Sequence, residues 1–118
     1  MTVTLSPAVQ ADAELREQIH SLTQFLQHEA GPVARAAHAS WDIRPGEPDM
    51  IEFQLRDDAT MRRAYFRRDD LRDKTRRELR ALQAVSYFLE QHSQRNMERL
   101  SVLIGRIAAE EEVANGNR

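Results

Sequence analysis

The spacing of apolar residues changes once along this 118-residue chain, and this change limits the folds that it can adopt. Over residues 51–66 apolar and polar side chains mostly alternate, which is the period of a strand with one buried face. From Asp69 onward the apolar residues recur every three or four positions for about forty residues, as in an amphipathic helix. We therefore predict an α+β fold, mainly helical, in which a β-hairpin leads into a long C-terminal helix.

A first helix is predicted over residues 7–29. Ser6 is a suitable N-cap, and Pro7 suits the first helical position because proline lacks an amide hydrogen. Gly31 and Pro32 are expected to end the helix. Its apolar face follows spacings of four, three and four residues, through Leu15, Ile19, Leu22 and Leu26.

The segment between this helix and the hairpin is less regular. Residues 32–40 are rich in alanine and are compatible with a short helix, and residues 44–48 are predicted to be a loop because two prolines flank a glycine. Trp41 is expected to fill the hydrophobic core, with Ile43 as a second isolated anchor. The hairpin is predicted as strands at 51–56 and 61–66 joined by a turn.

The last helix, for which Asp69 or Asp70 is the predicted N-cap, carries apolar residues that repeat every seven positions. Two such series lie side by side and form what we call the seam. The first helix can cover about 35 Å of the last helix, whereas forty helical residues span about 60 Å. The seam consists of Leu82, Ser86, Leu89, Ser93, Asn96, Leu100, Leu103 and Ile107.

The polar interruption at His92, Ser93 and Asn96, on or beside the seam, has three interpretations. It could mark a bend near residues 92–96, or a buried polar layer that sets the register of a helix dimer. It could also belong to a ligand or catalytic site in which Glu90, His92 and Glu98 transfer protons, although no nucleophile accompanies them.

Positive charge is concentrated in the middle of the chain. Residues 56–80 have a net charge of +4, whereas residues 1–55 have −5 and residues 81–118 have −1. Arginine beside an aromatic residue such as Tyr65 suits phosphate contact and base stacking, but interleaved carboxylates also favour an ion-paired solvated surface. The candidate partner-binding residues are Arg62, Arg63, Arg67, Arg68, Arg72, Arg76 and Arg80, of which the last three are expected on one helix face.

Catalytic and metal-binding motifs are sparse. Glu17 and His20 share a helix face, but a di-iron bundle needs two such pairs and two further glutamates. The chain has no cysteine and four glycines, and it contains no phosphate-binding loop or nucleophile motif. We therefore expect no enzymatic activity, no cofactor and no metal.

The length predicts a single domain over residues 1–118, with residues 1–6 and 110–118 flexible. No apolar run reaches the roughly 18 residues of a membrane span, and the first residues do not resemble a signal peptide. Without cysteine the chain is compatible with a reducing compartment, so a cytoplasmic location is expected.

These observations lead to one functional hypothesis and one alternative. Because the seam is longer than the rest of one copy can cover, we expect a non-enzymatic interaction protein that forms a homodimer through its C-terminal helix, as a coiled coil. Its Arg-rich hairpin and helix start would bind an acidic protein. The alternative is a nucleic-acid-binding protein that uses the same surface.

Overall fold

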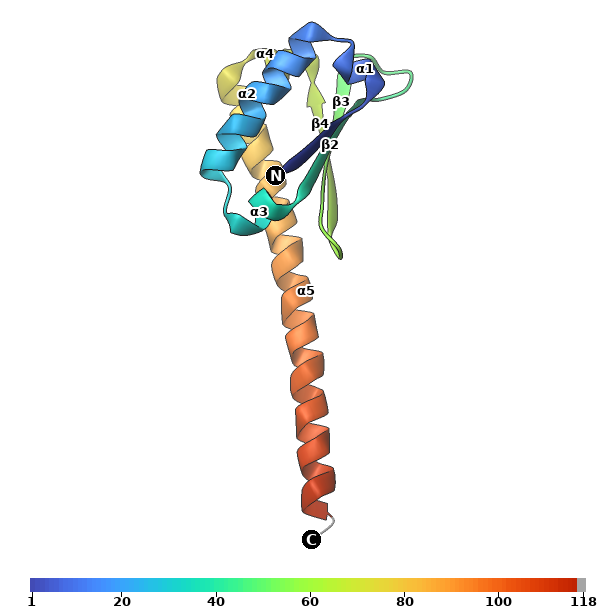
Figure 1. The fold of residues 1–118 in the computed structure, drawn as a ribbon, viewed down its shortest axis with the longest axis vertical. Helices are drawn as coiled ribbons and strands as arrows, with labels where there is room; N and C mark the ends of the chain where they lie inside the picture. Colours follow the sequence, from blue (N-terminus) through green and yellow to red (C-terminus); the bar gives the residue numbers. More distant parts are fainter. Residues whose placement is uncertain (117–118) are drawn as a thin grey trace.

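The computed structural model describes residues 1–116 and shows an α+β protein that is mainly helical (Figure 1). Within these residues, four strands and five helices follow one another. In order they are β1 (Thr2–Leu5), α1 (Pro7–Gln10), α2 (Ala13–Glu29), α3 (Pro32–Ala36), β2 (His38–Ile43), β3 (Met50–Arg56), β4 (Met61–Arg67), α4 (Arg68–Arg72) and α5 (Lys74–Gly116).

The four strands form one sheet in the order β1-β2-β3-β4. Strands β2, β3 and β4 are antiparallel neighbours, with Trp41 opposite Phe53 and Phe53 opposite Ala64. Strand β1 pairs with β2 in parallel, which requires a crossover connection. Helices α1, α2 and α3 make this connection, and α2 lies with the first half of α5 on one face of the sheet (Figure 1).

The core lies between that sheet face and the helices. Three aromatic rings form its centre, with ring centroids 4.4 Å apart for Trp41 and Phe53 and 5.3 Å apart for Trp41 and Phe66. The predicted core position of Trp41 is therefore confirmed. Strands β2 and β3 alternate buried and accessible residues, so the opposite face of the sheet carries mostly polar side chains. The helices contribute Leu15, Ile19, Leu22, Leu26, Ala81, Ala84, Val85 and Phe88.

The molecule is much longer than a globular chain of its size. Its Cα radius of gyration is 19.6 Å, whereas a compact chain of this length has about 13.5 Å. Helix α5 accounts for the difference, because its second half extends away from all other elements (Figure 1). We call residues 2–92 the body and residues 93–116 the stalk.

The N-terminal third differs from the prediction in three ways. Residues 1–6 were expected to be flexible, but Thr2–Leu5 form β1. Trp41 and Ile43 are not isolated anchors, because both belong to β2, so the hairpin is half of a larger sheet. The predicted helix over 7–29 is broken before Ala13, because Asp12 is extended and caps a new helix: the Leu15 amide donates to its Oδ1 at 3.1 Å.

The C-terminal helix also starts and ends differently. Neither Asp69 nor Asp70 is its N-cap, because both lie inside α4; Asp73 is extended and accepts a hydrogen bond from the Arg76 amide at 3.1 Å. The bend that residues 92–96 could have marked is absent, since α5 is continuous from Lys74 to Gly116. Helix therefore replaces most of the flexible segment expected at 110–118, of which residues 117–118 lie outside the described residues.

Candidate interaction surfaces

The stalk has no covering layer within the described part of the chain. Every residue from Ser93 to Gly116 is exposed, whereas Phe88, one turn before it, is completely buried. Five large apolar side chains cluster on one side of the stalk. They are Met97, Leu100, Leu103, Ile104 and Ile107, with exposed fractions between 52% and 67%.

The seam continues from the stalk onto the body. Leu82 and Leu89 are half-buried and touch the core, and Ser86 between them is exposed. The buried residues of α5, such as Val85 and Phe88, occupy the neighbouring face of the helix. The seam and the core-facing residues therefore occupy different faces of α5.

The stalk helix has little support of its own. None of the ion pairs among residues 1–116 lies within it, and Gly105 costs about 1 kcal/mol relative to alanine in a helix. A helix in water gains most of its stability by burying an apolar face. The stalk, as an isolated element, does not bury one.

A polar contact fixes the point where α5 leaves the body. His92 Nδ1 lies 2.8 Å from Asp57 Oδ2, and Asp57 Oδ1 accepts hydrogen bonds from the amides of Ala59 and Thr60 in the β3–β4 turn. Burial raises the pKa of Asp57, but these hydrogen bonds outweigh it and the pKa is lowered overall. The sequence predicted the turn but not its contact with His92, which is 35 residues away.

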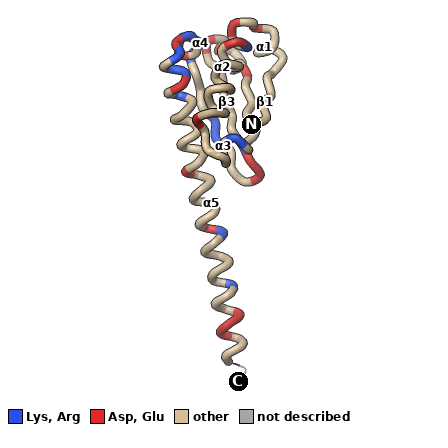
Figure 2. Tube along the Cα trace, turned by 60° about the vertical axis from the view of Figure 1, so that its left-hand side comes forward, with Lys and Arg blue, Asp and Glu red and all other residues tan. Residues whose placement is uncertain are grey.

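Most of the predicted Arg-rich surface is occupied by internal ion pairs. Five of the seven arginines lie within 4.0 Å of a carboxylate, and Figure 2 shows basic and acidic segments interleaved around α4 and the start of α5. The pairs are Arg63 with Glu52, Arg68 with Asp12, Arg72 with Glu14 and Asp69, Arg76 with Asp73, and Arg80 with Asp70.

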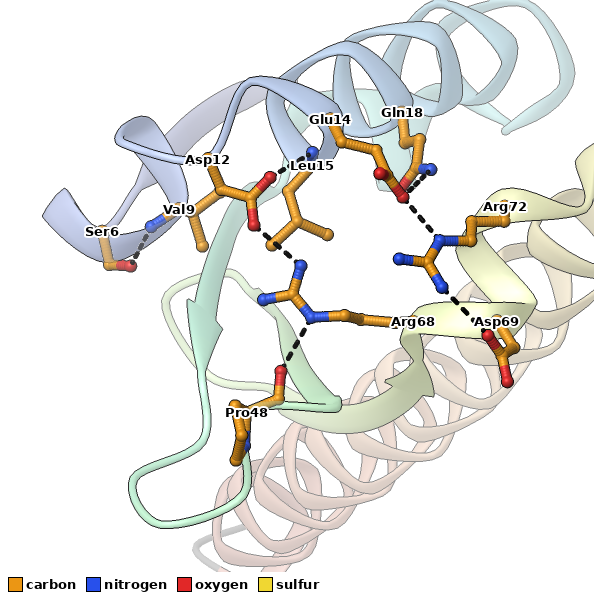
Figure 3. A network of polar contacts seen from close by, with 10 residues as sticks. All are labelled: Ser6, Val9, Asp12, Glu14, Leu15, Gln18, Pro48, Arg68, Asp69 and Arg72. Carbon is orange, nitrogen blue, oxygen red and sulfur yellow. Dashed lines mark hydrogen bonds and ion pairs between the residues drawn. The ribbon is translucent and has the colours of Figure 1, made fainter.

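Two of these arginines join α4 to the start of α2 (Figure 3). Arg68 Nη1 donates to Asp12 at 2.7 Å and its Nε donates to the Pro48 carbonyl at 2.9 Å, while Arg72 Nε donates to Glu14 at 2.6 Å. The Arg68 hydrogen bond, with that from the Leu15 amide, lowers the pKa of Asp12. Both arginines therefore link α4 to α2, Arg68 through a partly buried ion pair and Arg72 through an exposed one.

The predicted arginines come from three elements and point to different sides of the body. Arg72 belongs to α4 and Arg76 and Arg80 to α5, so the expected single helix face is wrong. The Arg62 guanidinium lies 4.8 Å from the centre of the Tyr87 ring on α5. By strand alternation, Arg63, Tyr65 and Arg67 share the uncovered face of the sheet.

The residues considered for metal binding and proton transfer do not come together in the described part of the chain. His20 lies 3.3 Å from Gln24 and is exposed, as is Glu17. The hydrogen bonds of residues 1–116 join His92 to Asp57 rather than to Glu90 or Glu98. Within these residues, no group of three or more metal-binding side chains converges, and none of the helices is both long and apolar enough to cross a membrane.

We expect Asp12→Ala to lower the free energy of unfolding by about 1–3 kcal/mol at pH 7, because it removes the cap of α2 and a charged hydrogen bond. Asp12→Asn keeps a capping oxygen and should cost less. Since folding lowers the pKa of Asp12, its charge stabilises the protein above about pH 4, and the difference between wild type and Asp12→Asn should shrink as the pH falls below this. Urea unfolding at pH 7 and in acid measures this; equal stability of all three proteins at pH 7 would contradict it.

The two surfaces are thus unequal: an apolar seam that lies open along the stalk, and arginines that are mostly paired. Comparisons with protein families, with curated proteins and with solved structures gave no match for this chain.

Proposed function

We propose that this chain is a small non-enzymatic interaction protein that acts as a homodimer through the seam of α5. The observation that supports this proposal is the stalk. All residues of this helix are exposed, and its apolar side chains keep a heptad spacing. Apolar patches of this kind typically mark interaction sites. A second copy supplies an identical seam, and the same patch on both subunits is the usual basis of a twofold dimer.

In this proposal the body presents a binding surface for a second protein. The positive charge of the Arg-rich hairpin favours an acidic partner. Because most of these arginines already pair with carboxylates of the same chain, only a few of them contribute to that charge. None of the ion pairs in residues 1–116 includes Arg67, which flanks Tyr65 on the uncovered sheet face. A cytoplasmic location belongs to the same proposal, because a chain without cysteine suits a reducing compartment.

Thermal unfolding at two concentrations tests the homodimer. A dimer that dissociates on unfolding has a midpoint that rises with protein concentration. We expect the midpoint, followed by circular dichroism, to rise between low micromolar and hundred-micromolar protein. A midpoint that is the same at both concentrations would contradict the proposal.

The alternative function is nucleic-acid binding, and one observation favours it. Tyr65 is 39% exposed, and the Arg44 guanidinium lies 5.2 Å from its ring centre. An accessible aromatic ring beside arginine is a common platform for unpaired bases. A mobility shift with mixed single-stranded DNA and RNA at about 50 and 200 mM salt tests this; binding should weaken at the higher salt, and an absence of binding at the lower salt would exclude it.

Asn96 gives a prediction about the specificity of the dimer. We expect Asn96→Leu to raise the thermal stability, because it replaces a buried polar layer with an apolar one, but also to broaden the oligomeric state. Light scattering coupled to size-exclusion chromatography measures the mass distribution. An unchanged oligomer with lower stability would show that Asn96 does not lie in the interface.

A further inference from the structure

We propose that the two seams pair in parallel and in register, which places both bodies at the same end of the dimer. This inference rests on the proposed homodimer and adds its orientation. Three observations carry it: the order of polar and apolar layers along the seam, the charges beside the seam, and the continuation of the seam onto the body.

The order of layers favours identical neighbours. In a parallel, in-register pair each residue meets its own copy, so Leu100, Leu103 and Ile107 form apolar layers and Asn96 meets a second amide. A buried amide needs a hydrogen-bond partner, and a second amide supplies both a donor and an acceptor. Ser86 and Ser93 also meet polar copies of themselves, so no apolar side chain is opposed by a polar one.

Antiparallel overlays of the same seam match less well. The best one over the full seam sets Asn96 against Ser93 and Leu89 against Leu100, but it opposes Leu103 to Ser86. An overlay of the two stalks alone brings Arg99 beside Arg106 of the partner subunit. The first loses apolar burial, and the second places like charges together.

Charges beside the seam complement each other in the parallel orientation. Arg106 flanks the seam just before Ile107, and Glu111 flanks its other side five residues later. Residues at these two positions face each other across a parallel coiled coil and often form ion pairs that set orientation. A parallel dimer therefore gains two Arg106–Glu111 pairs and, along the stalk, no like-charge pair at these positions.

The parallel orientation has a consequence for binding. Since Leu82 and Leu89 continue the seam onto the body, a parallel pair holds the two bodies side by side at one end. Two copies of the uncovered sheet face are then close enough to engage one partner, which raises the apparent affinity without new contacts. In this dimer the paired stalks set the distance between the two uncovered sheet faces.

Spin labels on single cysteines test the orientation, and the chain has no native cysteine to interfere. Glu112→Cys places a label on the outer side of the stalk, near its end. Labels on a parallel pair should be about 20–25 Å apart, from a helix spacing near 10 Å plus the helix width. The antiparallel overlays separate the two labels by more than about 30 Å, because each residue of offset adds 1.5 Å along the axis.

Gln94→Cys is the matched control, since it lies near the middle of the seam and reports a short distance in either full-seam orientation.

The outcomes separate this inference from the homodimer itself. Short distances at both positions are the expected result. A short distance at Gln94 with a long one at Glu112 would overturn the parallel orientation and keep the dimer. Absence of dipolar coupling at both positions would overturn the dimer as well.

A charge-reversal pair gives an independent measurement. Arg106→Glu should weaken dimerisation about two- to thirty-fold, and adding Glu111→Arg should restore it. No restoration would contradict the parallel pairing.

Discussion

Replacing Leu100 and Ile107 together by glutamate is expected to make the protein monomeric at micromolar concentration. Each of these side chains is more than half exposed in one copy and belongs to the stalk part of the seam, the proposed interface. Burying a leucine or isoleucine contributes about 1.5–3 kcal/mol, and a symmetric dimer loses four such side chains. Because each side chain is already partly covered in one copy, the loss is about 3–6 kcal/mol, which raises the dissociation constant by about 10²–10⁴. Light scattering after size-exclusion chromatography measures the mass.

Val102→Glu is the matched control for this change. Val102 is 56% exposed, like Leu100, but it lies two residues further along the helix and so points to the opposite side. The control should remain dimeric, since a glutamate there faces water. A monomeric control, or a dimeric double variant, would show that the seam is not the interface.

Phe53→Ala should destabilise the body by about 3–5 kcal/mol, the usual cost of removing a buried phenylalanine. Phe53 is 1% exposed, and its ring stacks on Trp41 and meets the edge of Phe66 at a centroid distance of 6.0 Å. Few substitutions in this chain should cost more, because the cavity would lie at the centre of the sheet–helix interface. Urea unfolding followed by tryptophan fluorescence measures the change, since Trp41 is the single tryptophan.

Tyr65→Ala serves as the control for this substitution. Tyr65 is an aromatic residue of the neighbouring strand, but it lies on the uncovered face of the sheet. Its removal should cost about 1 kcal/mol or less, which is typical of surface positions. Equal costs for the two variants would contradict the assignment of the helix-covered face as the core.

The elements with a long, regular apolar period were predictable from the sequence. The strands β3 and β4 and the helix α5 follow from the alternation over residues 51–66 and the heptad spacing after it. Strand β1 was missed because four residues are too few to establish an alternation. Strand β2 alternates through Ala39, Trp41 and Ile43, but the small alanine and the preceding alanine-rich segment obscured the pattern.

The two candidate surfaces differed in how far local spacing determines them. The seam lies on one helix, so residue spacing alone places Leu100 and Ile107 on the same side. The Arg-rich surface depends on where distant segments meet. Arg68 and Arg72 pair with carboxylates 56 and 58 residues earlier in the chain, and such contacts exist only after α4 packs against α2. Charge counts along the sequence do not contain this information.

Sedimentation equilibrium of the wild-type chain tests the central claim directly. The exposed seam predicts a dimer, with a mass of twice 13.6 kDa, at micromolar concentration. A single species of 13.6 kDa over the whole concentration range would show that the stalk stays uncovered in solution, and the proposed function would be wrong.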